Sequence, residues 1–231
     1  MWIIVKVGSA PPDLAERKGD FEHWFARGLG MDLAQCRVVD PRRGDPLPRA
    51  RECTAVVITG SAAMVTDRAA WSVRTAAWLP SLVASGVPTL GVCYGHQLLA
   101  EALGGEVSRN PLGRQIGTLD VSVRGEDAIV GNATLSVQTT HVESVVRPPE
   151  GAEVLATSER DPFHAFRIGS AWGVQFHPEM DAEIIRYYLD RRRVALQAEG
   201  LNADALIANA RDTPDGTALL RRFAAWSSVV V

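Results

Sequence analysis

A cysteine stands between two glycines where an apolar segment of the chain ends, in the sequence Thr89-Leu-Gly-Val-Cys-Tyr-Gly-His-Gln97. A strand that reverses sharply into a helix strains its central residue, and flanking glycines relieve the crowding. Cys93 would then start the helix, whose positive end favours the nucleophilic thiolate. The amide of Tyr94 would face a developing oxyanion. The pattern predicts a nucleophile, although a buried structural cysteine fits these few residues about equally well.

A histidine and a glutamate follow another apolar run, in the sequence Gly173-Val-Gln-Phe-His-Pro-Glu179. Histidine suits proton transfer near neutral pH, and a carboxylate can fix its tautomer. Pro178 favours an extended backbone at His177, and residues two apart in an extended chain face the same side. A surface turn explains this triplet better when it is taken alone. Together with Cys93, it predicts a nucleophile, a base and an orienting carboxylate.

The elements that must position these residues alternate along the first half of the chain. Short runs rich in β-branched residues predict buried strands at 2–5, 55–58 and 87–92. Between and after them, helices are expected at 21–29, 66–85 and 97–103, the last ending at a glycine pair. This alternation predicts an α/β fold with a parallel sheet flanked by helices.

The second half of the chain has a different pattern. Close-spaced short strands at 119–123, 135–138, 154–156, 165–168 and 172–176 predict an antiparallel portion of a mixed sheet. Helices are then expected at 183–197, 203–210 and 217–226. We expect residues 1–231 to form a single domain in which about residues 182–231 make a C-terminal helical appendage.

Composition excludes several classes of protein. The 231 residues are 46% hydrophobic and 22% charged with a net charge of -3, which fits one core and argues against a nucleic-acid-binding surface. No apolar run reaches about 18 residues, so no membrane span is expected, and residues 1–7 look like a first strand rather than a signal peptide. Cys36, Cys53 and Cys93 form no CxxC pair, so neither a metal nor a redox dithiol is expected. A reducing, cytoplasmic location is the simplest interpretation.

The two motifs, Gly91-Val-Cys-Tyr-Gly-His-Gln97 and Phe176-His-Pro-Glu179, resemble those of class-I glutamine amidotransferases. Within that family the likeness is greatest to free-standing proteins similar to the amidotransferase domain of GMP synthase, and it covers nearly the whole chain. The resemblance implies a flavodoxin-like α/β core that needs no cofactor. It also implies that Cys93 is the nucleophile, His177 the base and Glu179 its orienter.

The resemblance extends to the residues around the triad. The amide of Tyr94 and one from Gly60 or Ser61 would form the oxyanion hole. Gln97 and the backbone of Thr140, His141 and Val142 would hold the amino-acid end of glutamine. The ring of His141 is expected to be structural rather than catalytic.

Several positions depart from the family pattern. Ala62 replaces a proline in the oxyanion loop, which leaves the rigidity of that loop in question. Gln115 stands where glutamate is common, and Thr140 and Glu143 replace serine and aspartate. The run Arg191-Arg-Arg193 is expected to be a solvated helix face.

The expected reaction is cleavage of the side-chain amide of a glutamine-like small molecule through a γ-glutamyl thioester on Cys93. One hypothesis is a glutaminase or amidotransferase subunit that delivers ammonia to a synthetase partner in trans. A second is a γ-glutamyl peptidase or hydrolase, which an open pocket above Cys93 would favour. A third is a catalytically idle binding module on the same fold, against which the intact triad argues.

Overall fold

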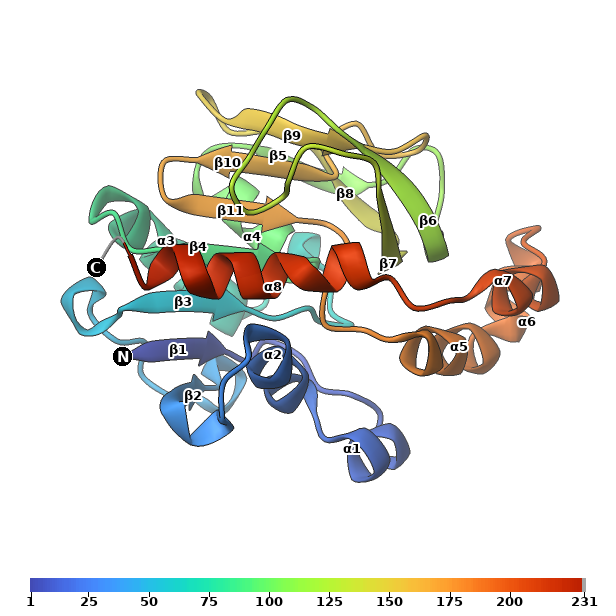
Figure 1. Ribbon diagram of the computed structural model, residues 1–231, viewed down its shortest axis with the longest axis horizontal. Helices are drawn as coiled ribbons and strands as arrows, with labels where there is room; N and C mark the ends of the chain where they lie inside the picture. Colours follow the sequence, from blue (N-terminus) through green and yellow to red (C-terminus); the bar gives the residue numbers. More distant parts are fainter. Residues whose placement is uncertain (230–231) are drawn as a thin grey trace.

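The computed structural model describes residues 1–229 and contains a nine-stranded mixed sheet (Figure 1). Five neighbouring strands run parallel, in the order β2 (Cys36–Val39), β1 (Trp2–Val5), β3 (Ala55–Ile58), β4 (Thr89–Val92) and β11 (Ala171–Val174). The sheet continues with antiparallel strands β10 (Ala165–Ile168), β9 (Glu153–Thr157), β6 (Gln115–Val123) and β7 (Leu135–His141). A separate antiparallel pair comprises β5 (Glu106–Arg109) and β8 (Glu143–Arg147).

Helices cover both faces of the parallel strands, which explains why the inner strands β1 and β3 are apolar and buried throughout. Trp2 and Ile4 of β1 contribute to the core cluster on one face, and Ile3 and Val5 to the cluster on the other. The first cluster includes side chains from α2 (Phe21–Leu29) and α8 (Pro214–Ser227). The second includes side chains from α3 (Ala70–Ala84) and α4 (Tyr94–Ala102).

The remaining helices are short. They are α1 (Pro12–Lys18), α5 (Ala182–Arg191), α6 (Arg193–Ala198) and α7 (Ala203–Asn209). The last three lie beyond the carboxyl ends of β1 and β3, and the chain then returns along α8 across one face of the sheet (Figure 1). Leu219, Leu220 and Phe223 of α8 are fully buried in the core. The predicted mixed, mainly parallel sheet flanked by helices is therefore confirmed.

The helices expected at 97–103 and 217–226 each begin three residues earlier, at Tyr94 and Pro214. Two other predicted helices are wrong for identifiable reasons. The helix expected at 66–85 begins at Ala70, because Thr66 lies in a separate 3-10 turn (Val65–Asp67) whose backbone and hydroxyl bond to Glu143. The helix expected at 183–197 is interrupted at Arg192, where ψ rises to 9°. Elements α1, β2, β5 and β8 were not predicted, and each is short and partly exposed or irregular in hydrophobicity.

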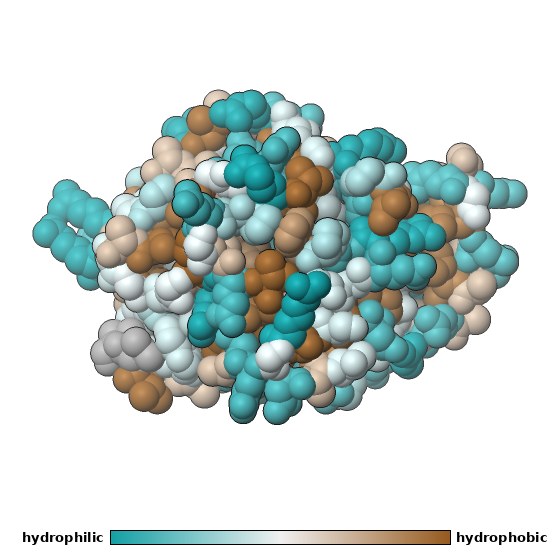
Figure 2. All heavy atoms as spheres, turned by 90° about the horizontal axis from the view of Figure 1, so that it is seen from above, coloured by the Kyte–Doolittle hydropathy of each residue, from teal (hydrophilic) through white to brown (hydrophobic). Residues whose placement is uncertain are grey.

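The surface is of mixed polarity. On the face shown in Figure 2, hydrophobic residues emerge in small groups between hydrophilic ones. Within residues 1–229, no helix has the length and apolar character required to cross a membrane.

Candidate active site

Cys93 lies at the sharp turn between β4 and α4, with φ 50° and ψ -100°. It is one of two non-glycine residues with positive φ in the described chain, a conformation that side chains normally avoid. A Cβ atom on Gly91 would come within 2.4 Å of the Gly95 carbonyl oxygen, and one on Gly95 within 2.5 Å of the Ile58 carbonyl oxygen. Glycine is therefore required on both sides of the turn, as the sequence predicted.

The topology of the sheet brings the two sequence motifs together. Strands β4 and β11 are parallel neighbours, with Gly91 opposite Gly173, and the Cys93 amide donates to the Val174 carbonyl at 2.8 Å. The carboxyl ends of parallel neighbours meet at one edge of the sheet. His177, which follows β11, is consequently placed beside Cys93, which follows β4.

His177 and Glu179 form a buried pair. The distance from Nδ1 of His177 to Oε1 of Glu179 is 2.7 Å, and neither side chain is more than 4% exposed. The His177 amide donates to the Gln138 carbonyl at 2.8 Å, which fixes the backbone before Pro178. Nε2 of His177 has no hydrogen-bond partner among the described residues, so this nitrogen is free to act on a reacting group.

The charge environment of His177 favours its protonated form. Burial by itself lowers the pKa of this imidazole, but the negative charges of the Glu179 carboxylate and then of the Cys93 thiolate raise it well above its usual value. An imidazolium beside Cys93 favours the thiolate, and Glu179 holds the ring with Nε2 facing away from the carboxylate.

The loop after β3 borders both motifs. A Cβ on Gly60 would lie 2.9 Å from Cε1 of His177 and 3.7 Å from Cβ of Cys93. Ala62 stands in this loop where the family pattern has a proline. A hydrogen bond holds the loop instead, in which Oγ of Ser61 accepts from the Ala63 amide at 3.1 Å. A Cβ on Gly8 would come within 2.4 Å of the Gly60 carbonyl oxygen, so the end of β1 also packs tightly on the loop.

The predicted oxyanion donors lie at this junction. Tyr94 is the first residue of α4, so its amide has no acceptor within the helix. Its side chain points elsewhere, donating a 2.6 Å hydrogen bond to Ser72. The amides of Gly60 and Ser61 belong to the loop that contacts Cys93 and His177.

A small cavity of about 60 Å³ adjoins Cys93. Its lining includes the predicted substrate residues Gln97, Thr140, His141 and Val142. The Thr140 carbonyl oxygen is 3.9 Å from Sγ of Cys93. The Gln97 side-chain nitrogen donates to the Glu143 carbonyl at 2.7 Å and to the Gln175 side-chain oxygen at 2.9 Å, so only the Gln97 side-chain oxygen is left for a ligand.

The ring of His141 is tied into the protein rather than directed at Cys93. Nδ1 lies 2.9 Å from the Glu143 carbonyl and Nε2 3.2 Å from the side-chain oxygen of Gln115. Burial lowers the pKa of His141 to about 4, so the ring is neutral near pH 7. With Nδ1 donating to the Glu143 carbonyl, the neutral ring presents Nε2 as an acceptor. The amide of Gln115 can meet it with its NH2 group when the amide is turned over, which a glutamate carboxylate cannot do. The longer side chain of Glu143 reaches the amide of Val65 at 2.9 Å.

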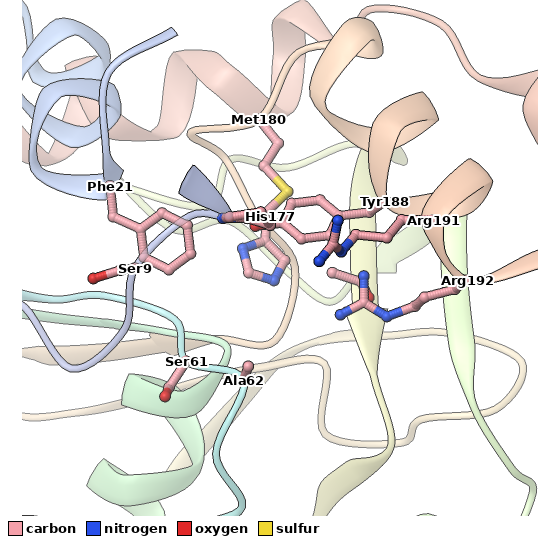
Figure 3. Close-up of a pocket in the computed structure, with 11 residues that line it drawn as sticks. Ser9, Phe21, Ser61, Ala62, His177, Met180, Tyr188, Arg191 and Arg192 are labelled. Atoms are coloured by element: carbon pink, nitrogen blue, oxygen red, sulfur yellow. The ribbon is translucent and has the colours of Figure 1, made fainter. Parts of the chain in front are cut away.

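A second, larger cavity of about 320 Å³ is lined by His177 and adjoins the small one, with which it shares Ser61, Ala62, Thr140 and Arg192 (Figure 3). The sequence did not identify this cavity, because its walls come from distant segments whose spacing carries no signal. They include Ser9, Phe21, Met180, Tyr188, Arg191 and Arg192. The predicted solvated face at 191–193 is wrong for Arg192: it is half-buried, at the break between α5 and α6, and lines both cavities.

His141, Asp161 and His164 are buried and each brings one potential metal-ligand atom within 4.8 Å of the others. Both nitrogens of His141 already face protein partners. These three residues therefore do not form a preformed metal site.

Comparison with known families decides the relationship. The model of the family described as "Glutamine amidotransferase class-I" matches residues 19–189 of the chain. The chain belongs to this family. The match contains every residue of the predicted triad and oxyanion loop, and all of the small cavity's lining except Arg192.

The family relationship also appears in individual proteins. The chain is 32% identical over 167 residues to one subunit of the glutamine-hydrolyzing GMP synthase of Sulfolobus acidocaldarius, covering 70% of this chain and 85% of that one. It is 35% identical over 170 residues to the glutamine-hydrolyzing GMP synthase of Aeropyrum pernix, again covering 70% of this chain. The chain matches only 31% of the length of that longer relative.

Solved structures support the fold. A glutamine amidotransferase of Thermotoga maritima superposes with a TM-score of 0.77 at 21% identity, covering 98% of this chain and 97% of the other. A glutamine amidotransferase of Methylobacillus flagellatus gives 0.72 at 22% identity, covering 98% and 92%.

Proposed function

We propose that this protein cleaves the γ-amide of glutamine or of a related γ-glutamyl compound. The observation that carries the proposal is the buried His177–Glu179 pair, 2.7 Å apart, beside a cysteine held in strained backbone at the start of a helix. Nucleophile, base and orienting carboxylate in this arrangement are the parts that covalent amide hydrolysis needs.

In the proposed mechanism, the Cys93 thiolate attacks the γ-carbonyl carbon and the C=O electron pair moves onto oxygen. The amides of Tyr94 and of Gly60 or Ser61 stabilise that oxyanion. The His177 imidazolium protonates the departing nitrogen, which leaves a γ-glutamyl thioester. Neutral His177 then deprotonates a water that attacks the thioester, and the products are glutamate and the regenerated thiol.

The small cavity suits the acyl side of this substrate. Gln97, Thr140, His141 and Val142 line the space next to Cys93. We assign this space to the amino-acid end of the glutamyl unit. No metal or organic cofactor has a step in this mechanism.

A synthetase acting in trans is the proposed destination of the ammonia. The relative from Sulfolobus acidocaldarius is one subunit of a glutamine-hydrolyzing GMP synthase, and this chain covers 85% of it. We extend that arrangement to this protein, so that it would hydrolyse glutamine for a separate partner chain that uses the ammonia.

A second candidate is a γ-glutamyl peptidase or hydrolase, in which the leaving amine is larger than ammonia. The cavity of about 320 Å³ beside His177 favours it, because this is the side on which the leaving nitrogen must be protonated. Ammonia is about the size of one water and would leave most of that space unused.

The test is hydrolysis by the purified protein of glutamine and of a panel of γ-glutamyl amides and peptides. Ammonia or amine release that Cys93→Ala abolishes supports the proposal, and the preferred leaving group distinguishes the two candidates. Cys53→Ala is the matched control, because Cys53 lies outside both cavities and should leave the rate unchanged. An inactive protein whose Cys93 also resists iodoacetamide would instead indicate an idle binding module.

A further inference from the structure

Two adjacent arginines face the cavity on the leaving-group side of His177. Figure 3 shows the guanidinium groups of Arg191 and Arg192 extending from the end of α5 toward the side where His177 lies. The opposite wall is mostly apolar and includes Pro11, Phe21 and Met180. The cavity therefore has a positive end and a hydrophobic side.

Arg192 has no anionic partner in the described part of the chain. Its guanidinium carbon lies 4.9 Å from the centroid of the Tyr188 ring, and no hydrogen bond or ion pair of this side chain occurs within residues 1–229. Neighbouring cations are neutralised: Arg193 pairs with Asp190 at 2.7 Å, and Arg114 binds Glu199 at 2.8 Å. A half-buried guanidinium without a carboxylate is costly unless a ligand supplies one.

The reaction geometry determines which part of a substrate meets these arginines. The acyl carbon must reach Cys93, and the nitrogen must face His177, which protonates it. Substituents on that nitrogen consequently extend into the larger cavity. Arg191 lines only that cavity, whereas Arg192 lines both. Arg192 thus lies between the glutamyl unit and the leaving amine, and Arg191 adds a second positive charge on the leaving-amine side only.

We infer that the preferred substrate is a γ-glutamyl amide whose leaving amine carries a carboxylate, which Arg192 binds with support from Arg191. The inference rests on the proposed function and narrows it to a substrate class. A guanidinium binds a carboxylate through two parallel hydrogen bonds, and the apolar wall accommodates the short carbon chain between the amine and its acid group. An amine with a neutral end would leave Arg192 buried and unpaired.

The test measures binding rather than turnover, so that it does not depend on the chemical step. Cys93→Ala protein is titrated by calorimetry with γ-glutamylglycine and with its neutral counterpart, γ-glutamylglycinamide. The acidic ligand is expected to bind at least about tenfold more tightly, in line with a charge-assisted hydrogen bond. The ratio should fall in about 1 M salt, where the screening length shortens to about 3 Å.

Arg192→Met, made in the same Cys93→Ala background, should reduce the ratio to near one, because methionine keeps the contact with Tyr188 but has no charge. Arg193→Met is the matched control and should keep the ratio, since Arg193 lines neither cavity. If Arg192→Met does not fold, Arg192→Lys is used and should give an intermediate ratio.

Equal binding of the two ligands by protein with Arg192 intact overturns the inference, as does a ratio that Arg192→Met leaves unchanged. Either result would indicate that the Arg192 guanidinium pairs with another group, such as an acidic side chain of a protein partner. The proposed function fails separately, if protein with Cys93 intact hydrolyses neither glutamine nor any γ-glutamyl amide.

Discussion

His177 lies close to a cluster of three other histidines, and its pKa is shifted in the opposite direction from theirs. His177 and the cluster His96, His141 and His164 are all buried. Burial lowers the pKa of His96 to about 3 and that of His141 to about 4, and it lowers the pKa of His164 well below the usual value. For His177 the same burial is more than offset, and its pKa is raised.

The difference follows from the partners of each ring. His177 has a carboxylate at 2.7 Å and the Cys93 thiol beside it. His141 instead faces a backbone carbonyl and the neutral amide of Gln115, and His164 stacks on Phe176. Burial alone therefore makes a neutral structural histidine here, and an added anion converts one into a candidate catalytic group.

Replacing Glu179 with glutamine should have the largest effect, because it removes the carboxylate beside His177. His177 then resembles the three histidines of the cluster, which are buried without an anionic partner. The pKa of His177 falls and its tautomer is no longer fixed. We expect kcat/KM for the amide substrate to drop by about 1,000- to 10,000-fold, the scale seen when a triad carboxylate becomes an amide.

The pH dependence of iodoacetamide alkylation checks the cause in Glu179→Gln. Alkylation of Cys93 near pH 6 should slow, because the imidazolium that favours the thiolate is lost. Glu183→Gln, on the exposed side of α5, serves as the control and should change neither measurement. Unchanged alkylation in Glu179→Gln would contradict the proposed origin of the His177 charge.

A pair of glycine substitutions compares the two environments by crowding one ring in each. In Gly60→Ala the new Cβ would lie 2.9 Å from Cε1 of His177, and in Gly173→Ala 2.6 Å from Nδ1 of His96. Gly60→Ala should lower kcat/KM by about 100-fold, as misplaced catalytic groups do, with little loss of stability. Gly173→Ala should instead cost about 1–3 kcal/mol of unfolding free energy.

Urea denaturation measures the stability of both variants, and steady-state kinetics measures their activity. Folded Gly173→Ala should keep most of its activity, because His96 takes no part in the chemistry. A loss of activity without a loss of stability in Gly173→Ala would show that the two environments are coupled.

Acid should destabilise the fold through the buried cluster. His96, His141 and His164 have folded pKa values below the unfolded value of about 6.5, so their stabilisation is complete above that pH and is lost as pH falls. Asp161 acts in the opposite direction, because burial raises its pKa to about 6. The net loss should be about 2 kcal/mol between pH 6.5 and 5.5.

His177 adds nothing to this loss. Its folded pKa is raised, so its stabilisation is fully present below about pH 6.5 and is lost only as pH rises toward the folded value. His164→Phe removes one of the three titrating rings and should reduce the slope of unfolding free energy against pH by roughly one proton, about 1.4 kcal/mol per pH unit. An unfolding free energy that does not change between pH 6.5 and 5.5 would contradict the prediction that these three histidines are neutral in the folded protein.

The sequence was informative where local geometry restricts residue type. The glycines around Cys93 and the proline after His177 mark specific backbone conformations, so the nucleophile turn and the histidine triplet could be located without a structure. The apolar strands of the parallel sheet were predicted for a related reason: burial on both faces removes polar residues from them. The neutrality of His141 was less accessible, because it depends on burial by segments distant in the sequence, such as the one that carries Gln115, 26 residues away.

The larger cavity shows what local patterns could not provide. Arg192 belongs to a run of three arginines, and such runs normally lie in solvent. Its burial depends on the break between α5 and α6 and on the packing of that junction over Tyr188. Neither the break nor the facing segment near Ser9 has a sequence signature, so only the assembled fold reveals the cation beside His177.

The substitution with the smallest expected effect is the most direct test of the comparison between His177 and the cluster, because it supplies an anion to one ring of the cluster. In Gln115→Glu a carboxylate would replace the amide oxygen now 3.2 Å from Nε2 of His141. The pKa of His141 should rise by about one unit or more, which corresponds to about 1.4 kcal/mol. Histidine NMR resonances followed against pH measure the shift, and Gln115→Met, which has no charge, should leave the pKa low. If Gln115→Glu also leaves it low, burial rather than the partner's charge controls these rings, and the raised pKa of His177 needs another cause.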